Sequence, residues 1–363
     1  MKGNLFAVAK KGGRFIFAAA VLLVCSFQLG AADNRRGESA KEGIAASYAE
    51  EGHDRVNDAS QFFDLYSTDY AKRVVDYLTQ RKLKGREAGT KEAVKAMKFI
   101  VKEFRKAGYG PLLQPFSREE LEAAIGKPKE GKAAYPLQQC NVVAKLEGRN
   151  KDKFIVVGAH YDHLGYIEGV GIHPGADDNA SGIVALLSLA KMMKTADIVP
   201  QYTILFCAWD GEEKGLLGSK FFVNTWPSET VVPGCEASLK ESVVHYMNFD
   251  MVGRTITPEN PGVMFAWNNN YPYLLKICQA AQKGIDLPFQ VLLDERRGDG
   301  RGGSDYAPFS AQDIPFIAWM EDFMHVDYHK PTDTPDKLHW EKLRKTTQLA
   351  FAILYDLSTG GCE

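Results

Sequence analysis

The chain has 363 residues, of which 45% are hydrophobic and 25% are charged, and its formal net charge is −2. This composition is typical of a globular protein with a sizeable core, arranged as one large domain or two ordinary ones. Because there is no excess of either charge, we expect no nucleic-acid partner and no binding to an anionic membrane surface. Function must therefore reside in local sites.

Residues 1–32 have the pattern of a secretory signal peptide. A basic start precedes the apolar stretch FIFAAAVLLVCSF, which is short for a membrane span, and small residues up to Ala32 form a cleavage site. We therefore expect a periplasmic or secreted protein with no stable membrane span after processing. The alternative is a lipoprotein anchored at Cys25, although Val24 before it is bulky for that processing.

Residues 33–60 are charged and poor in apolar residues, which is typical of a flexible tether. Residues 61–363 are expected to form a single domain. Its clearest early helix is TKEAVKAMKFIVKEFRKAGYG, in which Thr90 can cap the start, apolar residues recur on one face, and Gly108 ends the helix.

Strand-like runs then alternate with helical segments. The runs are NVVAKLE, FIVVGAHYD, YTILFCAWD, VVHYMNFDM and IPFIAWM, and the helical segments are SGIVALLSLAKMMK, YPYLLKICQAAQKG and EKLRKTTQLAFAILYDLS. The alternation predicts an α/β fold, a three-layer sandwich around a mixed, largely parallel central sheet. Residues 117–137, rich in Lys, Glu and Gly, and residues 224–240 are expected to be surface insertions.

Three of the strand-like runs end in residues that bind metals. One runs into His160 and Asp162, one into Glu212 and Glu213, and one into Asp250. Taken singly, each has a structural explanation, such as a solvated acid pair at the start of a helix. Ligands of open α/β sheets bind beyond the carboxyl ends of the strands, so together these runs predict a metal site at that edge.

The stretch PGADDNASG places two adjacent carboxylates, Asp177 and Asp178, ahead of a helix that Asn179 or Ser181 can cap. Because adjacent carboxylates repel each other, the pair is either a solvated helix start or is neutralised by a cation. The sequence also contains the match GDGRGG to a dinucleotide-binding loop, but it leads into SDYAPF and not into a strand-turn-helix unit, so we reject that function.

Most of the histidines are expected to be bystanders. His329 stands out because it lies in the Pro-rich loop DYHKPTDTPDKL between the last strand and the last helix, and His325 is its nearest competitor. His173 lies close to PGADDNASG and is easily mistaken for a ligand. The cysteines form no CxxC pair, and their pairing stays open; Cys207, within TILFCAW, is expected to be a buried apolar residue.

Six motifs occur in one order: GAHYDHLG, GADDNASG, WDGEEKGLLGS, NFDMVG, GGSDYAPF and DYHKPTDT. In this order the chain resembles the secreted bacterial zinc aminopeptidases with two co-catalytic metals, from about LKGREAGT to the C-terminus. Their superfamily also contains glutamate carboxypeptidases and glutaminyl cyclases. The resemblance implies a zinc-dependent exopeptidase with two Zn²⁺ ions per chain and peptide substrates.

The resemblance also implies a ligand set. His160 and Asp250 would bind one zinc ion, Glu213 and His329 would bind the other, and Asp178 would bridge both. Nitrogen and oxygen donors of this kind suit zinc.

Further roles follow from the same resemblance. Glu212 would be the general base, Asp162 would orient His160, and Tyr328 would polarise the scissile carbonyl. Asp177 is left with a supporting role beside the bridging carboxylate.

Three alternatives remain on the same fold. A glutaminyl cyclase uses one zinc ion, and the peptidase-type motifs DDNASG and EEKGLLGS argue against it. A carboxypeptidase needs a cation for the terminal carboxylate of its substrate, which Arg254, Arg296, Arg297 or Arg301 could supply. A non-catalytic binding ectodomain would lack a ligand or the base, and this chain has all six.

Overall fold

The computed structural model describes residues 59–255, 262–268, 270–283, 285, 290–296, 303–321 and 324–359. The expected signal peptide, Cys25 and nearly all of the expected tether lie outside these described residues. In the part of the chain that is described, no helix is both long enough and apolar enough to cross a bilayer.

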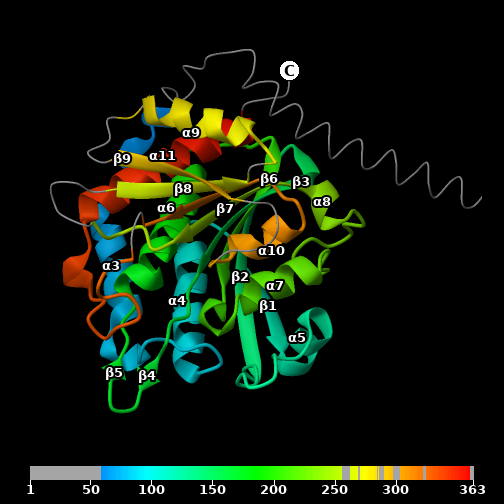
Figure 1. The fold of residues 1–363 in the computed structure, drawn as a ribbon. Coiled ribbons are helices and arrows are strands. Elements are labelled where there is room, and N and C mark those ends of the chain that lie inside the picture. Colours follow the sequence, from blue (N-terminus) through cyan, green and yellow to red (C-terminus); the bar gives the residue numbers. More distant parts are fainter. Residues whose placement is uncertain are drawn as a thin grey trace, which may run out of the picture.

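A mixed sheet of eight strands forms the middle layer (Figure 1). Its order is β1-β2-β6-β3-β7-β10-β8-β9, and the four central strands β6, β3, β7 and β10 are parallel to one another. The flanking strands join this group through antiparallel pairs, β2-β6 on one side and β10-β8 on the other. The pair β1-β2 is also antiparallel. The strands are β1 (Leu112–Ser117), β2 (Gln138–Leu146), β3 (Asn150–His160), β6 (Tyr202–Trp209), β7 (Val243–Asp250), β8 (Gly262–Asn268), β9 (Gln290–Arg296) and β10 (Phe316–Met320).

Helices cover both faces of the sheet, as the three-layer prediction requires. One face packs against α3 (Thr68–Thr79), α4 (Lys91–Lys106), α6 (Gly182–Thr195), α9 (Tyr273–Lys283) and α11 (Trp340–Thr359). The other face carries α7 (Leu217–Asn224), α8 (Leu239–Ser242) and α10 (Tyr306–Ala311), with α5 (Arg118–Ile125) packed on α7. The hairpin of β4 (Tyr166–Ile167) and β5 (Gly171–Ile172) stands apart at the lower end of Figure 1.

Strand β3 shows how one strand serves both layers. Ile155 and Val157 point into the core under α4, α6 and α11, whereas Phe154 and Val156 point into the core under α7, α8 and α10. Successive side chains of a strand alternate between faces, so a strand buried on both sides must be apolar at every position. This is why FIVVGA and YTILFCAW read as continuous hydrophobic runs.

Two helix starts follow the expected capping. The side chain of Thr90 accepts a hydrogen bond from the third backbone N–H of α4 at 3.3 Å. Asn179 Oδ1 accepts one from Gly182 N at 3.0 Å, while Ser181 Oγ donates to the carbonyl of Asp177. Of the two candidates for α6, Asn179 therefore provides the cap.

The sequence did not predict β1, β8 or β9. Strand β1 lies at one edge of the sheet and contains Pro115, so it lacks the continuous buried apolar pattern of the central strands, and β9 lies at the other edge. The segment 117–137 opens with α5, whose capping box joins Ser117 and Glu120 and whose Leu121 is buried against α7. The start of that segment is therefore a packed helix.

Candidate metal and catalytic site

The predicted site residues lie at one edge of the sheet. His160 is the last residue of β3 and Asp250 is the last residue of β7, while Glu212 and Glu213 lie in the short helix η4 (Glu212–Lys214) that follows β6. These three strands are parallel neighbours, so their carboxyl ends meet at the same edge.

The first donor group contains His160, Asp178 and Asp250. His160 Nε2 lies 3.3 Å from Asp250 Oδ1 and 3.4 Å from Asp178 Oδ1, and all three side chains are buried. One imidazole nitrogen and two carboxylate oxygens therefore converge on one point, within 4.8 Å of one another.

The second donor group contains His329, Asp178 and Glu213. His329 Nε2 lies 3.3 Å from Asp178 Oδ2 and 3.3 Å from Glu213 Oε2. Asp178 thus turns one carboxylate oxygen to each group. A carboxylate shared in this way is the arrangement that joins two metal ions.

The spacing of these atoms fits zinc. Ligands bound tetrahedrally at about 2.0–2.2 Å are separated from one another by about 3.3–3.6 Å, which is the edge of the tetrahedron. The four distances from His160 Nε2 and His329 Nε2 to the carboxylate oxygens of their donor groups are 3.3 or 3.4 Å. Both groups therefore have the donor types and the spacing of zinc ligands.

His163 lies in the site, although it was not among the residues predicted from the sequence. Its Nδ1 lies 2.7 Å from Glu213 Oε1 and 3.7 Å from Asp178 Oδ2, so it could take the place of His329 in the second donor group. The 2.7 Å separation is a hydrogen-bond length and is shorter than the edge of a zinc tetrahedron. Burial lowers the pKa of His163 to about 3, so its neutral ring is suited to orienting Glu213.

The Asp162 carboxylate contacts both the Glu212–Glu213 pair and His160. Oδ1 accepts a hydrogen bond from Glu212 N at 3.0 Å, and Oδ2 accepts one from Glu213 N at 3.3 Å. The same carboxylate lies 3.6 Å from His160 Nδ1. Asp162 therefore positions the Glu pair by its backbone and lies beside the second nitrogen of His160, where an orienting partner is found at many zinc sites.

The two adjacent aspartates point in different directions. Asp177 Oδ1 accepts a hydrogen bond from Gly253 N at 2.7 Å, and its Oδ2 lies 3.2 Å from His325 Nε2. Asp178 instead faces the two donor groups. The Asp333 carboxylate accepts hydrogen bonds from the backbone N–H groups of both aspartates, which holds the turn between them.

Arg86 supports the same loop, a role that was not predicted from the sequence. The fully buried guanidinium donates to the carbonyls of Leu78, Tyr161, Pro174, Gly175 and Asp178. Gly175 has a φ of 60°, and a Cβ there would overlap the carbonyl of Asp178. The loop that carries Asp178 is therefore set by a buried cation and a residue without a side chain.

The electrostatics of the site reflect crowded carboxylates. Burial raises the pKa of Glu212 well above its usual value, and the field of Asp250 adds to the effect while His160 opposes it. Burial alone would lower the pKa of His329, but hydrogen bonds to Asp178 and Glu213 outweigh it and raise the pKa to about 10. This negative field favours cations.

Tyr328 and Arg254 lie at the border of the site. The Tyr328 ring stacks on His329 with ring centroids 3.7 Å apart, and burial followed by the field of Asp178 raises the pKa of its hydroxyl. Arg254, a candidate anchor for a terminal carboxylate, is buried and donates to Asp327 at 2.8 Å. The side chains of Arg296, Arg297 and Arg301 lie outside the described residues.

The described cysteines Cys140, Cys207, Cys235 and Cys278 are free thiols. Cys207 is fully buried in β6, as its apolar run predicts. Cys25 and Cys362 lie outside the described residues.

Comparison with known proteins gives a family. The chain matches Peptidase family M28 over residues 141–354. It is 33% identical to Leupeptin-inactivating enzyme 1 of Streptomyces exfoliatus over 48% of this chain and 34% of that protein. It is 25% identical to Leucine aminopeptidase 1 of Leptosphaeria maculans over 68% of this chain and 63% of that protein. The chain thus spans less than two thirds of the length of either relative.

Solved structures share the fold at low sequence identity. The LapA aminopeptidase of Legionella pneumophila superimposes with a TM-score of 0.65 at 21% identity, covering 86% of this chain and 77% of that one. A glutaminyl cyclase of Bacteroides thetaiotaomicron superimposes with a TM-score of 0.61 at 18% identity, covering 80% and 98%. The fold therefore does not distinguish hydrolysis from cyclisation, and the site must do so.

Proposed function

The chain belongs to Peptidase family M28, and from that membership we propose that it is an aminopeptidase, which removes N-terminal residues from peptides. The observation that carries the proposal is the pair of donor groups that share Asp178 next to Glu212. The name Leucine aminopeptidase 1 of one relative supports the same reaction.

The metal that we propose is zinc, with two ions per chain. His160 and Asp250 would hold one, His329 and Glu213 would hold the other, and Asp178 would contribute one oxygen to each; the 3.3–3.4 Å donor separations support this assignment. When bound, zinc supplies Lewis-acid polarisation and lowers the pKa of water from about 16 toward about 7.

Glu212 moves the proton in this mechanism. Its Oε2 lies 4.0 Å from His160 Nε2, beside the donor groups but outside their 3.3–3.4 Å contacts. The carboxylate accepts a proton from the attacking water as the oxygen bonds to the peptide carbonyl carbon. It then gives that proton to the leaving nitrogen as the C–N bond breaks. Because water attacks directly, no acyl-enzyme forms.

The surrounding residues keep this carboxylate in place. Asp162 accepts the backbone N–H of Glu212, and His163 orients the neighbouring Glu213 at 2.7 Å. Tyr328, beside His329, is proposed to polarise the scissile carbonyl through its hydroxyl. The raised pKa of that hydroxyl is consistent with a proton donor at neutral pH.

A panel of unblocked aminoacyl p-nitroanilides and short peptides tests the proposal, with N-acetylated peptides as the control. We expect release of free N-terminal residues from unblocked peptides only, and about two zinc ions per chain. A chelator should abolish hydrolysis, and added Zn²⁺ should restore it. Cleavage of N-acetylated peptides from the C-terminus would indicate a carboxypeptidase, and formation of pyroglutamate without hydrolysis would indicate a cyclase.

We also propose that the protein is exported, because residues 1–32 have the composition of a signal peptide. Mass spectrometry of the mature protein from its natural source should then find Asp33 at the N-terminus. A lipidated N-terminal Cys25 would instead support the lipoprotein alternative, and an unprocessed Met1 would contradict export by either route.

A further inference from the structure

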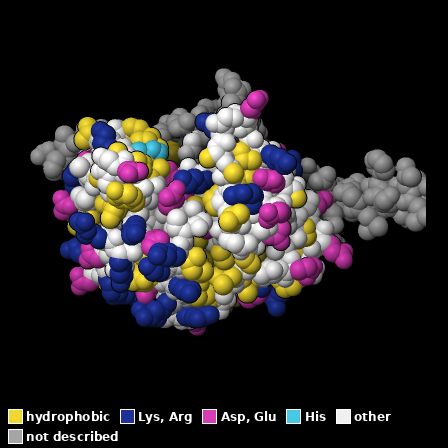
Figure 2. Space-filling model, turned by 90° about the horizontal axis from the view of Figure 1, so that it is seen from below, with side chains coloured by type: hydrophobic (Ala, Val, Ile, Leu, Met, Phe, Trp, Pro, Cys, Tyr) yellow, Lys and Arg dark blue, Asp and Glu magenta, His cyan; other side chains and the backbone are white. Residues whose placement is uncertain are grey.

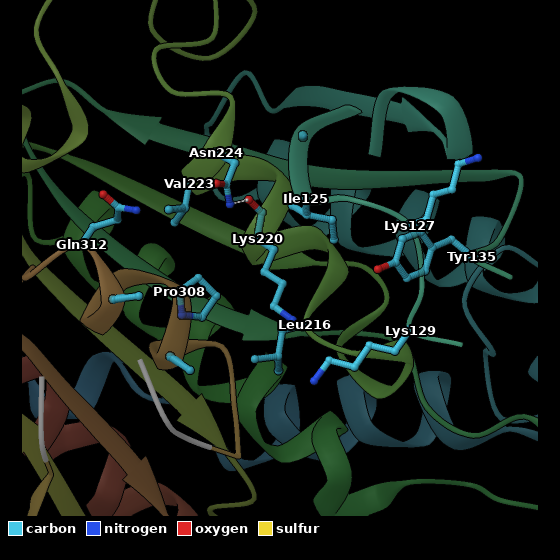
Figure 3. Close-up of a pocket in the computed structure, with 13 residues that line it drawn as sticks. Ile125, Lys127, Lys129, Tyr135, Leu216, Lys220, Val223, Asn224, Pro308 and Gln312 are labelled. Carbon is cyan, nitrogen blue, oxygen red and sulfur yellow. Dashed lines mark hydrogen bonds between the residues drawn. The ribbon is translucent and has the colours of Figure 1, made fainter. Parts of the chain in front are cut away.

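A cavity of about 620 Å³ lies between α5, α7, α10 and the segment that follows α5 (Figure 3). Its charged lining residues are Lys127, Lys129 and Lys220, and no Asp or Glu lines it. Apolar side chains such as Ile125, Val223 and Pro308 form much of the remaining wall. A volume of this size is ordinary for a ligand pocket. The combination of cations and apolar wall favours a ligand with an anionic group on an apolar body.

Two of the lysines converge inside this cavity, which we call the lysine pocket. In Figure 3 the Lys129 and Lys220 side chains extend toward the same region near Leu216, whereas Lys127 points away from them. Lys220 Nζ donates to the carbonyl of Gly215 at 2.9 Å. In the described part of the chain, no carboxylate forms an ion pair with Lys129 or Lys220.

Among the described residues, the two lysines therefore have no carboxylate in direct contact, although two carboxylates act on Lys220 from a greater distance. Burial lowers the pKa of Lys220, and the positive charge of Lys129 adds to this, while Asp305 and Glu212 oppose it. A partly buried cation next to a second cation is stabilised by an anion that reaches both. Figure 2, which views the molecule from below, shows Lys and Arg side chains interspersed with Asp and Glu side chains around hydrophobic patches on that face.

The lysine pocket adjoins the proposed catalytic base. Leu216, in its wall, donates its backbone N–H to the carbonyl of Glu212 at 2.8 Å. Ala307 and Pro308, on the opposite wall, lie two and three residues after the buried Asp305. The residue that gives its proton to the leaving nitrogen is therefore joined by one backbone hydrogen bond to the wall of the lysine pocket.

We propose that the lysine pocket binds a carboxylate of the peptide substrate on the leaving-group side, with Lys220 and Lys129 as its charge partners. At neutral pH, carboxylates are the common anionic groups of an unmodified peptide. The source is either the terminal carboxylate of a short peptide or an acidic side chain near the cleaved bond. This inference rests on the proposed function, and it predicts a preference for short acidic or free-acid peptides.

The test compares kcat/KM for unblocked peptides of two to four residues, each as the free acid and as the C-terminal amide. A further amide with Glu after the cleaved residue separates the two sources of carboxylate. In the wild type we expect kcat/KM for the carboxylate form to exceed that for the amide by about 5- to 20-fold at one or more peptide lengths. One charge-assisted hydrogen bond provides a preference of this size. The preference should appear mainly in KM.

Lys220→Gln and Lys129→Gln should each reduce the ratio of kcat/KM for the free acid to kcat/KM for the amide. The double variant should bring this ratio close to 1. Lys220→Arg should retain most of it. Lys102→Gln is the matched control, because Lys102 is exposed on α4, on the other face of the sheet. Equal rates for acids and amides in the wild type, or a ratio unaffected by both substitutions, would overturn the proposal.

Binding provides a readout that does not depend on turnover. The zinc-loaded Glu212→Gln variant, titrated calorimetrically with the same acid and amide peptides, should show the same preference and lose it with Lys220→Gln. If no peptide is hydrolysed by the wild type but the binding preference is present, the aminopeptidase function fails while the lysine pocket stands. If peptides are hydrolysed without any binding preference, the aminopeptidase function stands and the proposal for the lysine pocket fails.

Discussion

Glu212→Gln is expected to lower kcat by about 10²–10⁴-fold while leaving the zinc content and the fold unchanged. The amide has nearly the same shape as the carboxylate but cannot accept the proton of the attacking water. Zinc should be retained because Glu212 lies outside the two donor groups, 4.0 Å from His160 Nε2. The loop should also be retained, because Asp162 holds the Glu212 backbone N–H and not its side chain.

Steady-state kinetics, metal analysis and thermal unfolding measure these three quantities separately. Glu147→Gln is the matched control, since Glu147 is exposed beside Lys145 at 2.7 Å and its loss costs at most about 1 kcal/mol. Unchanged peptide cleavage by Glu212→Gln would disprove the general-base role. Loss of zinc together with activity would make Glu212 a ligand.

Asp178→Asn is expected to remove both hydrolysis and normal zinc binding. One Asp178 oxygen lies 3.4 Å from His160 Nε2 and the other lies 3.3 Å from His329 Nε2, so the substitution weakens both donor groups at once. An amide has one good acceptor oxygen and no charge. The loss of zinc affinity should therefore exceed the about 10- to 100-fold that follows from removing an orienting partner.

The neighbouring aspartate provides the control for this experiment. Asp177→Asn should lose stability, because Asp177 Oδ1 is the acceptor for Gly253 N and its Oδ2 faces His325, but it should keep its zinc. Zinc raises the unfolding temperature by mass action when it binds the folded state alone. We expect that rise in Asp177→Asn and little of it in Asp178→Asn. Equal zinc retention by the two variants would contradict a bridging Asp178.

The central part of the fold could be predicted from the sequence. Strands buried on both faces must be apolar throughout, so β3, β6 and β7 were recognisable as runs, and parallel strands bring their ends together, so His160 and Asp250 could be expected at one edge. The edge strand β1, with Pro115, and the partly covered α5 have weaker patterns because they bury one face or less.

Tertiary contacts decided the rest, because the direction of a side chain depends on partners distant in sequence. Asp177 and Asp178 are chemically identical, and although the resemblance assigned the bridging role to Asp178, it is the backbone N–H of Gly253 and the position of His325 that physically turn Asp177 away. The role of Arg86 was not predicted from the sequence, and only the fold shows that five carbonyls accept hydrogen bonds from its guanidinium. Lys129 and Lys220 lie 91 residues apart on separate elements and share a cavity only because α5 packs against α7. The sequence by itself determined which residue types reach the edge of the sheet, and the packing of distant segments determined which of their atoms face one another.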